Sequence, residues 1–345
     1  MWRDLPAIDD CGPDRDELAA SGEFETIRCC PICRNVGTMK IAIRDLACGV
    51  GGVYHYMRCC GCGGWWLFNR FTRRDIGLAY PDTYYSYSEA VPVVGDWVDR
   101  ALAGRYGRCV PWFVTVAGKM LQAYPPAGTV GRVLDIGCGN GARLHRLRRA
   151  GWMCSGVEGN VDAAARARDE GLDVRHGSGE KLPFGSGAFD AVVMAHSIEH
   201  CHDPRQVLRE VHRVLRVGGH VVVTTPNVRS LTRVVFGSYW RCWDAPRHLV
   251  LFDRKSMVDL LSAEGFGIQR IRGSSSGDGL VGSAFQRFGQ PTGRRSEAIM
   301  RMVAAGVALL TNWSTWSDEM EITATKVPEC CGDRVMAPSP RSGYK

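Results

Sequence analysis

The stretch VLDIGCGNGA at residues 133–142 constrains the fold of this chain more than any other feature. An apolar run of strand length enters a turn with closely spaced glycines, and a helical pattern, ARLHRLRRAG, follows directly. Further strands are expected at SGVEG, LDVRHG, FDAVVMA and HVVVTTPN, with helical patterns such as VDAAARARDEG and PRQVLREVHRVLRVGG among them, and GIQRIRG and EMEITATKV can close the sheet. This alternation predicts an α/β fold with a doubly wound, largely parallel sheet.

Two classes of cofactor fit the glycine-rich turn. Gly137 and Gly139, with an alanine three residues later, satisfy the dinucleotide pattern G-x-G-x-x-G/A, and together with Gly141 they satisfy the G-x-G-x-G of S-adenosylmethionine (SAM) enzymes. Asp135, at the end of the preceding strand, would oppose a pyrophosphate but favour the ammonium group that SAM carries. Glu158, at the end of the second strand, can accept hydrogen bonds from the ribose hydroxyls of either cofactor. Asp135 therefore favours SAM over a nicotinamide dinucleotide.

Two C-x-x-C pairs near the N-terminus indicate a small metal-binding unit. The pairs Cys30/Cys33 and Cys59/Cys62 are separated by 25 residues, a spacing that fits two tight turns sharing one tetrahedral zinc ion. The apolar runs MKIAI and VYHYMR between them predict the hairpin strands of a zinc ribbon. Four thiolates leave no open coordination position, so we expect a structural zinc ion without chemistry of its own.

The alternatives for these cysteines concern ligand identity and redox chemistry. Cys29 and Cys60 adjoin the proposed ligands and can replace them in the assignment. A thioredoxin-like role would need one C-x-x-C at the start of a helix in a βαβ unit, which neither pair shows. Gly63, just after the second pair, suits the left-handed conformation that such turns use, whereas Arg34 in the matching position suits it less well.

A family resemblance emerges when the central motifs are taken in order. LDIGCGNG, VEGN, GSGEKLPF, FDAVVMAHSIEH, LRVGGHVVVTTPN and APRHLVLF resemble the class I SAM-dependent methyltransferases, the group that includes the ubiquinone-biosynthesis type, over residues 132–273. The CPxC…CxxCG pairs and the DTYYSY stretch look like the bacterial subset with a zinc ribbon ahead of the methyltransferase domain. The resemblance implies a Rossmann-like sheet of seven strands.

The resemblance also implies a cofactor site. It assigns Asp135, Gly137, Gly139 and Gly141 to the methionine end of SAM and Glu158 to the ribose. Near the adenine it points to Ser178 and Glu180, although family members commonly carry an acidic residue at the position of Ser178.

Two histidines are candidate general bases. Methyl transfer is an in-line displacement that depends largely on alignment, but an oxygen or carbon acceptor usually needs a base. His200, in SIEHCHDP, follows the fourth strand beside Glu199, and His248, in APRHLVLF, lies in a loop expected to cover the pocket. The alternative for each is a histidine that merely fixes its loop. His196 and His202 are weaker candidates.

These features divide the chain into five parts. We expect a flexible N-terminus at residues 1–25, the ribbon at 26–75, a helical linker or cap at 76–128, the SAM-binding domain at 129–328 with an insertion at 273–317, and a disordered tail at 329–345. Tyr84, Tyr85, Trp240 and Trp243 are candidates to line the acceptor pocket, and the alternative is that they only pack at a domain seam.

The location of the protein follows from its N-terminus and its apolar segments. No basic segment followed by an apolar one begins the chain, so we expect a cytoplasmic protein without a signal peptide. The apolar stretch at residues 302–310 is about half the ~20 residues that a membrane span needs, which favours a buried helix.

Three functions compete for this sequence. The leading one is a SAM-dependent methyltransferase acting on a small molecule, such as a sugar, a glycan-lipid intermediate or a secondary metabolite. The second is an RNA-modifying or ribosome-modifying methyltransferase whose ribbon grips nucleic acid through Trp65, Trp66, Arg70, Arg73 and Arg74. The net charge of +7 is too diffuse, with 43 basic and 36 acidic residues, to decide for nucleic acid. The third is a non-catalytic SAM-binding scaffold. The sequence sets no oligomeric state.

Overall fold

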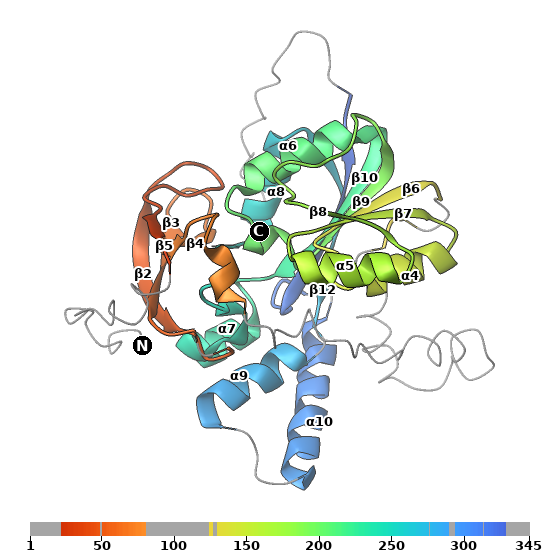
Figure 1. Ribbon diagram of the computed structural model, residues 1–345. Coiled ribbons are helices and arrows are strands. Elements are labelled where there is room, and N and C mark those ends of the chain that lie inside the picture. Colours follow the sequence, from red (N-terminus) through yellow and green to blue (C-terminus); the bar gives the residue numbers. More distant parts are fainter. Residues whose placement is uncertain are drawn as a thin grey trace, which may run out of the picture.

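The computed structural model describes two connected parts of the chain, a small N-terminal unit and a larger α/β domain (Figure 1). The described residues are 22–48, 50–80, 124–126, 130–275, 277–289, 294–312 and 314–328. The expected tail at 329–345, Tyr84, Tyr85 and most of the segments 1–25 and 76–128 lie outside them.

A seven-stranded sheet forms the centre of the larger domain, in the order β12-β13-β10-β9-β6-β7-β8. Its strands are β6 (Arg132–Ile136), β7 (Met153–Glu158), β8 (Asp173–His176), β9 (Phe189–Ala195), β10 (Leu215–Pro226), β12 (Phe266–Ser274) and β13 (Glu319–Lys326). The strands from β10 to β8 run parallel, and β13 runs antiparallel to both β10 and β12. Every strand expected from the sequence of this domain is present, so the prediction of a doubly wound α/β sheet is confirmed.

Helices cover both faces of this sheet (Figure 1). Side chains alternate between the faces of a strand, so neighbouring residues of one strand pack against different helices. Leu134 belongs to the core cluster that holds the buried residues of α6 (Pro204–Val214) and α8 (Arg254–Ala263), whereas Val133 packs with Leu147 of α4 (Ala142–Arg149). The fourth covering helix, α5 (Val161–Asp169), contacts β8.

Side-chain caps in the sequence fix where these helices begin. Asn160 accepts a hydrogen bond from the main-chain N–H of Ala163 at the start of α5, and Asp203 does the same for Gln206 at the start of α6. At the start of α8, Asp253 forms a full capping box with Ser256. The caps hold the loops before these helices at fixed positions along the sheet.

The N-terminal unit is built from short strands around the cysteine pairs. Its elements are β1 (Phe24–Thr26), β2 (Gly37–Arg44), β3 (Val53–Cys59), β4 (Trp65–Leu67), β5 (Asn69–Phe71) and the short helix η1 (Ile76–Ala79). The strands β2 and β3 are the hairpin expected from MKIAI and VYHYMR. A strand from the larger domain, β11 (Val250–Leu251), pairs antiparallel with β4 and completes a four-stranded sheet in the order β11-β4-β3-β2. We call this N-terminal unit, residues 22–80, the ribbon.

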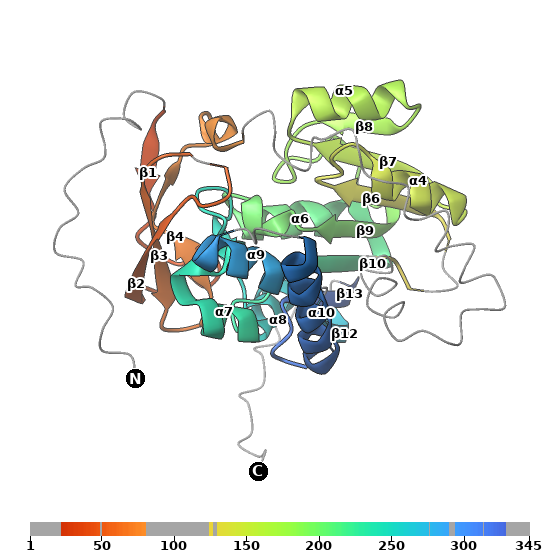
Figure 2. The ribbon, with the colours of Figure 1, turned by 90° about the horizontal axis from the view of Figure 1, so that it is seen from below.

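The remaining helices gather at one end of the molecule (Figures 1 and 2). They are α7 (Leu231–Phe236), the short helices η4 (Gly237–Tyr239) and η5 (Arg241–Trp243), α9 (Asp278–Phe288) and α10 (Arg294–Thr311). The apolar stretch at 302–310 does lie in a helix, but the prediction that it is buried is wrong: Ala304 and Ala308 are 1% exposed, whereas Met302 is 67% and Leu310 85% exposed. Within the described ranges, no helix combines the length and the apolar character needed to cross a membrane.

Candidate functional site

The glycine-rich turn leaves β6 with its glycines in a conformation that other residues adopt only under strain. Gly137, Gly139 and Gly141 have φ angles of 74°, 55° and 82°. A Cβ on Gly137 would lie 2.8 Å from the Cβ of Ser197, and one on Gly141 would lie 2.2 Å from Leu172. Both the backbone conformation and the space around the turn therefore require glycine. Glycine is also the residue that lets a ligand come close to the main chain.

Two carboxylates flank this turn. Glu158, at the end of β7, is 9% exposed and accepts hydrogen bonds of 2.8 Å from the main-chain N–H groups of Gly139 and Asn160. Asp135 is fully buried at the end of β6, and its carboxylate lies 3.3 Å from a guanidinium nitrogen of Arg143. Burial raises the pKa of Asp135, and Arg143 offsets part of that rise. The arrangement concentrates negative charge beside the main-chain N–H groups of the turn.

The two residues expected near the adenine have other contacts in this structure. Ser178 is exposed, and its hydroxyl accepts a hydrogen bond of 3.2 Å from the main-chain N–H of Glu180. The Glu180 carboxylate accepts a hydrogen bond of 2.8 Å from the N–H of Asp203 and forms an ion pair with Arg73 of the ribbon. Glu180 thus joins the start of α6 to the ribbon, and its role at a cofactor stays a prediction, as does that of Ser178.

The turn after β9 brings a second polar group to the same edge of the sheet. Ser197 touches Gly137, and the short helix η3 (Ile198–His200) follows it. Glu199 is completely buried; its carboxylate lies 3.3 Å from Nδ1 of His196 and accepts a hydrogen bond of 3.0 Å from the Thr225 hydroxyl. Burial alone would raise the pKa of Glu199, but the hydrogen bond and charge of His196 and the nearby imidazoles lower it to about 2. Glu199 is therefore an anion at neutral pH.

His196 is a site residue that the sequence favoured less than the structure does. Its φ angle is 52°, and its Nε2 lies 3.5 Å from the carboxylate of Glu319 on β13. Burial alone would lower the pKa of His196, but Glu319 and Glu199 together raise it above its ordinary value. The left-handed backbone directly after a strand was not visible in the sequence, because HSIEH carries no glycine that would mark it.

The two candidate bases, His200 and His248, lie together. Their rings meet edge to face with centroids 4.7 Å apart, and the Glu199 carboxylate offers an atom within 4.8 Å of atoms of both rings. Burial, followed by the neighbouring His248, lowers the pKa of His200 to about 4. His200 is therefore neutral near pH 7.

Main-chain carbonyls determine which nitrogen of each ring carries the proton. Nδ1 of His200 lies 3.0 Å from the carbonyl oxygen of Arg247, and Nδ1 of His248 lies 2.8 Å from that of Cys242. A carbonyl oxygen only accepts, so each contact favours a proton on Nδ1 whenever the ring is neutral and leaves the lone pair on Nε2; at His200 the Tyr80 hydroxyl lies 3.0 Å from the same Nδ1. Each ring thus contacts its loop through Nδ1, Nε2 of His248 lies 3.8 Å from the Asp244 carboxylate, and the role of either ring as a base stays a prediction.

Tyr80 adds a contact that sequence reasoning missed. It lies at the end of η1, and its hydroxyl is 3.0 Å from Nδ1 of His200. Only the fold brings these residues together, since 120 positions separate them in the chain.

The four predicted cysteine ligands form one cluster in the ribbon. Sγ of Cys30 lies 3.7 Å from that of Cys62, Sγ of Cys33 lies 3.3 Å from that of Cys59, and all four sulfur atoms lie within 4.8 Å of one another. A tetrahedral site with Zn–S bonds of about 2.3 Å places its sulfur atoms about 3.8 Å apart, so the cluster fits this geometry.

The surroundings of the cluster also agree with a cation site. The hydrogen bond from Cys30, followed by burial, raises the pKa of Cys62, so a positive charge at the centre of the cluster would favour its thiolate form. Arg34 and Gly63, in matching positions after the two pairs, have φ angles of 66° and 80°, the left-handed conformation expected for both turns. Cys60 is exposed, and its Sγ donates to the carbonyl of Val36 rather than joining the cluster.

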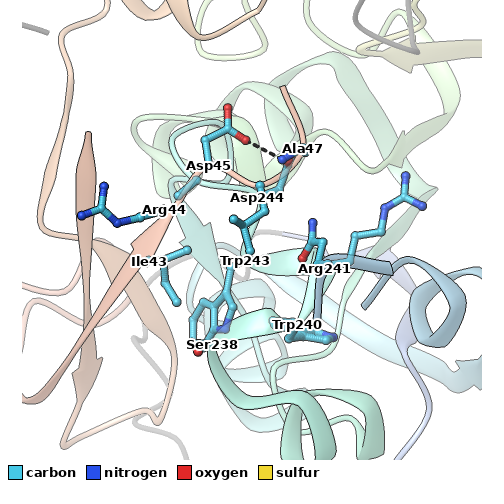
Figure 3. A pocket seen from close by; sticks show the side chains of 12 residues that line it. Ile43, Arg44, Asp45, Ala47, Ser238, Trp240, Arg241, Trp243 and Asp244 are labelled. Atoms are coloured by element: carbon cyan, nitrogen blue, oxygen red, sulfur yellow. Dashed lines mark hydrogen bonds between the residues drawn. The ribbon is translucent and has the colours of Figure 1, made fainter. Parts of the chain in front are cut away.

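The aromatic residues at the seam pack the ribbon against the larger domain. Trp240 and Trp243 are each 1% exposed, and the Trp243 ring lies 5.3 Å from that of Trp65 and 5.0 Å from that of Tyr56. A hollow beside this cluster, lined by Asp45 and Asp244 among others, encloses about 200 Å³ including space open to solvent (Figure 3). Because that volume includes open solvent, the enclosed space is smaller still and falls well short of the ~300–1,000 Å³ that ligand pockets usually enclose. Trp240 and Trp243 thus serve mainly to join the two units.

Comparison with known proteins agrees with this architecture. Residues 113–271 match a family described as a methyltransferase domain. The chain therefore contains a class I SAM-dependent methyltransferase domain.

Individual relatives match over the same region. A probable S-adenosylmethionine-dependent methyltransferase from Mycolicibacterium smegmatis is 32% identical over 151 residues, which are 43% of this chain and 57% of that protein. A ubiquinone biosynthesis O-methyltransferase from Ruegeria pomeroyi is 33% identical over 151 residues, which are 41% of this chain and 56% of that protein. The chain thus spans little more than half the length of these relatives. A solved SAM-dependent methyltransferase from Thermotoga maritima, described as a possible histamine N-methyltransferase, is 20% identical with a TM-score of 0.42, covering 67% of this chain and 99% of that one.

Proposed function

We propose that this chain transfers a methyl group from SAM to an oxygen, carbon or nitrogen atom of a small-molecule acceptor. The observation that supports the proposal is the pair of imidazoles, His200 and His248, which lie edge to face and contact main-chain carbonyls through Nδ1; Nε2 of His248 lies 3.8 Å from the Asp244 carboxylate. Ser197, three residues before His200, touches Gly137 itself, so a cofactor on the turn and an acceptor near the imidazoles would be neighbours.

The cofactor contacts that we propose follow the turn. Asp135 and the main chain at Gly137, Gly139 and Gly141 hold the methionine end of SAM, and Glu158 accepts hydrogen bonds from the ribose hydroxyls. Each Glu158 oxygen already accepts one main-chain N–H, which fixes the carboxylate while leaving lone pairs for the ribose. Ser178 and Glu180 are the residues proposed for the adenine side.

The chemistry that we propose needs alignment and one proton acceptor. SAM supplies a methyl group on a positively charged sulfur, which leaves as the neutral thioether when the new bond to the acceptor atom forms. For a hydroxyl or carbon acceptor, Nε2 of His200 or His248 takes the proton that the acceptor loses. With a pKa of about 4, His200 is unprotonated at neutral pH and can accept a proton, but it is a weak base. Single variants of His200 and His248 are needed to decide which of them takes the proton.

The ribbon favours a small acceptor over nucleic acid. Trp66 is completely buried and Trp65 is 5% exposed, so neither can stack on a base. Arg70 is 5% exposed and pairs with Glu25, and Arg73 pairs with Glu180. Of the five residues of this stripe, Arg73 and Arg74 are exposed and Arg73 pairs with Glu180, so no exposed aromatic ring remains beside them to stack on a base, which supports a small acceptor.

We also propose that Cys30, Cys33, Cys59 and Cys62 bind one structural Zn²⁺ as thiolates. The proposal is supported by the sulfur distances and by the left-handed turns after each pair. Metal analysis of freshly purified reduced protein should give one zinc per chain, and a protein that folds without metal would contradict the assignment.

The first experiment is methyl transfer from radiolabelled SAM into a cell extract that is then separated into RNA, protein, lipid and small molecules. Label in a lipid, sugar or small-molecule fraction supports the proposal, whereas RNase-sensitive label would overturn the choice of acceptor class. Glu158→Gln serves as the control that should abolish the label by weakening SAM binding. No label in any fraction, with SAM bound, would favour a scaffold.

The histidine roles are tested with the acceptor fraction so found. His200→Ala and His248→Ala are each compared with the wild type after SAM affinity has been checked. We expect the base variant to lose about 100-fold or more in turnover. Turnover near that of the wild type in both variants would dismiss a histidine base.

A further inference from the structure

Both candidate bases are held by the same short stretch of chain. The carbonyls that fix Nδ1 of His200 and Nδ1 of His248 belong to Arg247 and Cys242. We call residues 241–248 the holding segment. Its conformation decides which tautomer each imidazole adopts and where each Nε2 lies.

A buried tyrosine of the ribbon binds the holding segment. Tyr56 on β3 is completely buried, and its hydroxyl lies 2.7 Å from the carbonyl of Trp243 and 2.5 Å from that of His248. A hydroxyl has a single proton to donate, so the two carbonyls share it. The Tyr56 ring also packs against that of Trp243.

A buried ion pair makes a second connection. The side chains of Asp45, in the ribbon loop after β2, and Arg247 are both completely buried, and they form two hydrogen bonds of 2.8 and 3.0 Å. Arg247 also binds Asp244 within the segment at 2.7 Å. Figure 3 shows Asp45 close to Asp244 and Trp243.

We propose that the ribbon completes the acceptor site, with Tyr56 and Asp45 as positioning residues for His200 and His248. They act through the holding segment, whose carbonyls keep both imidazoles in the Nδ1–H tautomer. This inference rests on the proposed methyltransferase function for its catalytic consequence. It gives the ribbon a role in the reaction without contact with the acceptor.

The sharpest test compares two tyrosines of one strand. Tyr56→Phe removes only the hydroxyl that reaches the holding segment, while the ring stays against Trp243. Tyr54→Phe is the matched control: Tyr54 is 1% exposed, and its hydroxyl donates to the carbonyl of Gly51 inside the ribbon at 2.8 Å. Each variant loses one hydroxyl from a buried side chain of β3.

Two readouts separate positioning from stability. Nitrogen NMR of ¹⁵N-histidine-labelled protein at pH 7 reports the tautomers of His200 and His248, assigned with His200→Gln and His248→Gln. Turnover and KM are measured with the accepting fraction, and SAM affinity and zinc content show that the protein is folded.

We expect Tyr56→Phe to lose the single Nδ1–H tautomer and about 10- to 100-fold in kcat, since small misplacements of reacting groups cost that much. SAM affinity should stay within about twofold, and Tyr54→Phe should match the wild type. If Tyr56→Phe does not fold, Asp45→Asn serves in its place. This variant weakens the ion pair with Arg247 but keeps an oxygen that accepts the main-chain N–H groups of its own loop, and it should show the same loss of the single tautomer and of kcat.

Three results would overturn the inference. They are unchanged tautomers and kcat in Tyr56→Phe, a loss of kcat with both tautomers unchanged, and equal losses in Tyr54→Phe and Tyr56→Phe. If the wild type transfers no methyl group at all, the proposed function fails, and the tautomers alone still decide whether the ribbon positions the imidazoles.

Discussion

The ion pair between Asp45 and Arg247 should contribute more to stability than any exposed pair between the ribbon and the larger domain. Both side chains are completely buried, and Arg247 binds both carboxylate oxygens of Asp45. Asp45→Ala leaves a buried guanidinium that keeps Asp244 and the carbonyl of Ala79 but loses its bidentate partner. Removing one partner of a buried pair costs about 3–5 kcal/mol, which is a large share of the ~5–15 kcal/mol that stabilises a typical domain.

The two partners of this pair should not be equivalent. Asp45 also accepts the main-chain N–H groups of Ala47, Cys48 and Val50 at 2.9 to 3.0 Å. Arg247→Met leaves the carboxylate with these three donors, so we expect a smaller loss of about 1–3 kcal/mol. The double variant, in which neither charge is left alone, should lose less than the sum of the single variants.

Urea unfolding at pH 7 in the presence of zinc measures these losses. Tryptophan fluorescence follows the seam, where Trp65, Trp66, Trp240 and Trp243 are buried, and circular dichroism follows the central sheet. Arg34→Ala is the control, because Arg34 is 64% exposed and lies 3.8 Å from Asp203 across the same seam, where an ion pair is worth about 0–1 kcal/mol. A loss below about 1 kcal/mol for Asp45→Ala, or equal losses for Asp45→Ala and Arg247→Met, would refute the reasoning.

Three further predictions concern the turns, the imidazole and the metal. Arg34→Gly should stabilise the zinc-loaded protein by about 1 kcal/mol, and Gly63→Ala should destabilise it by a similar amount, because both residues have positive φ angles. Changes in Tm measure both effects, and changes of the opposite sign would contradict the turn geometry. His200 has a pKa of about 4, so between pH ~6.5 and ~4 the unfolded chain binds more protons, and the free energy of unfolding should fall as the pH is lowered. His200→Gln should flatten this decline, and an unchanged slope would count against the burial of His200. Removing the metal from the four-cysteine cluster should lower the rate of methyl transfer about tenfold or more, because zinc supplies the folding energy of a ribbon. SAM affinity should stay within about twofold. A parallel loss of SAM binding would show instead that the ribbon stabilises the whole domain.

The sequence predicted the central sheet well because its signals are local. Each strand is a short apolar run, and caps such as Asp253 mark where helices begin. The turns after the cysteine pairs were equally readable, since a thiolate knuckle requires a left-handed residue whether the chain supplies Gly63 or Arg34.

The contacts between the ribbon and the larger domain could not be predicted in the same way. The strand β11 is two residues long and shows no alternation, and its pairing with β4 joins positions about 185 residues apart. The helix at 302–310 was expected to be buried because it is apolar, but only its alanine face meets the protein. The helical pattern ARLHRLRRAG does not reveal that Arg143 turns toward Asp135 at the end of β6. Each of these outcomes depends on packing between distant segments.

The two histidines of the SIEH turn show why such packing decides the chemistry. His196 and His200 are four positions apart with Glu199 between them, and the sequence favoured His200 over His196 as a base without indicating how their charges differ. His196 faces the carboxylates of Glu199 and Glu319, which raise its pKa, whereas His200 is buried against a second imidazole, which lowers its pKa to about 4. Glu319 and Glu199 therefore favour the charged form of His196. His200 stays neutral near pH 7 because burial and His248 outweigh the same Glu199 carboxylate, so one carboxylate lies between a ring whose pKa is raised and a ring whose pKa is lowered.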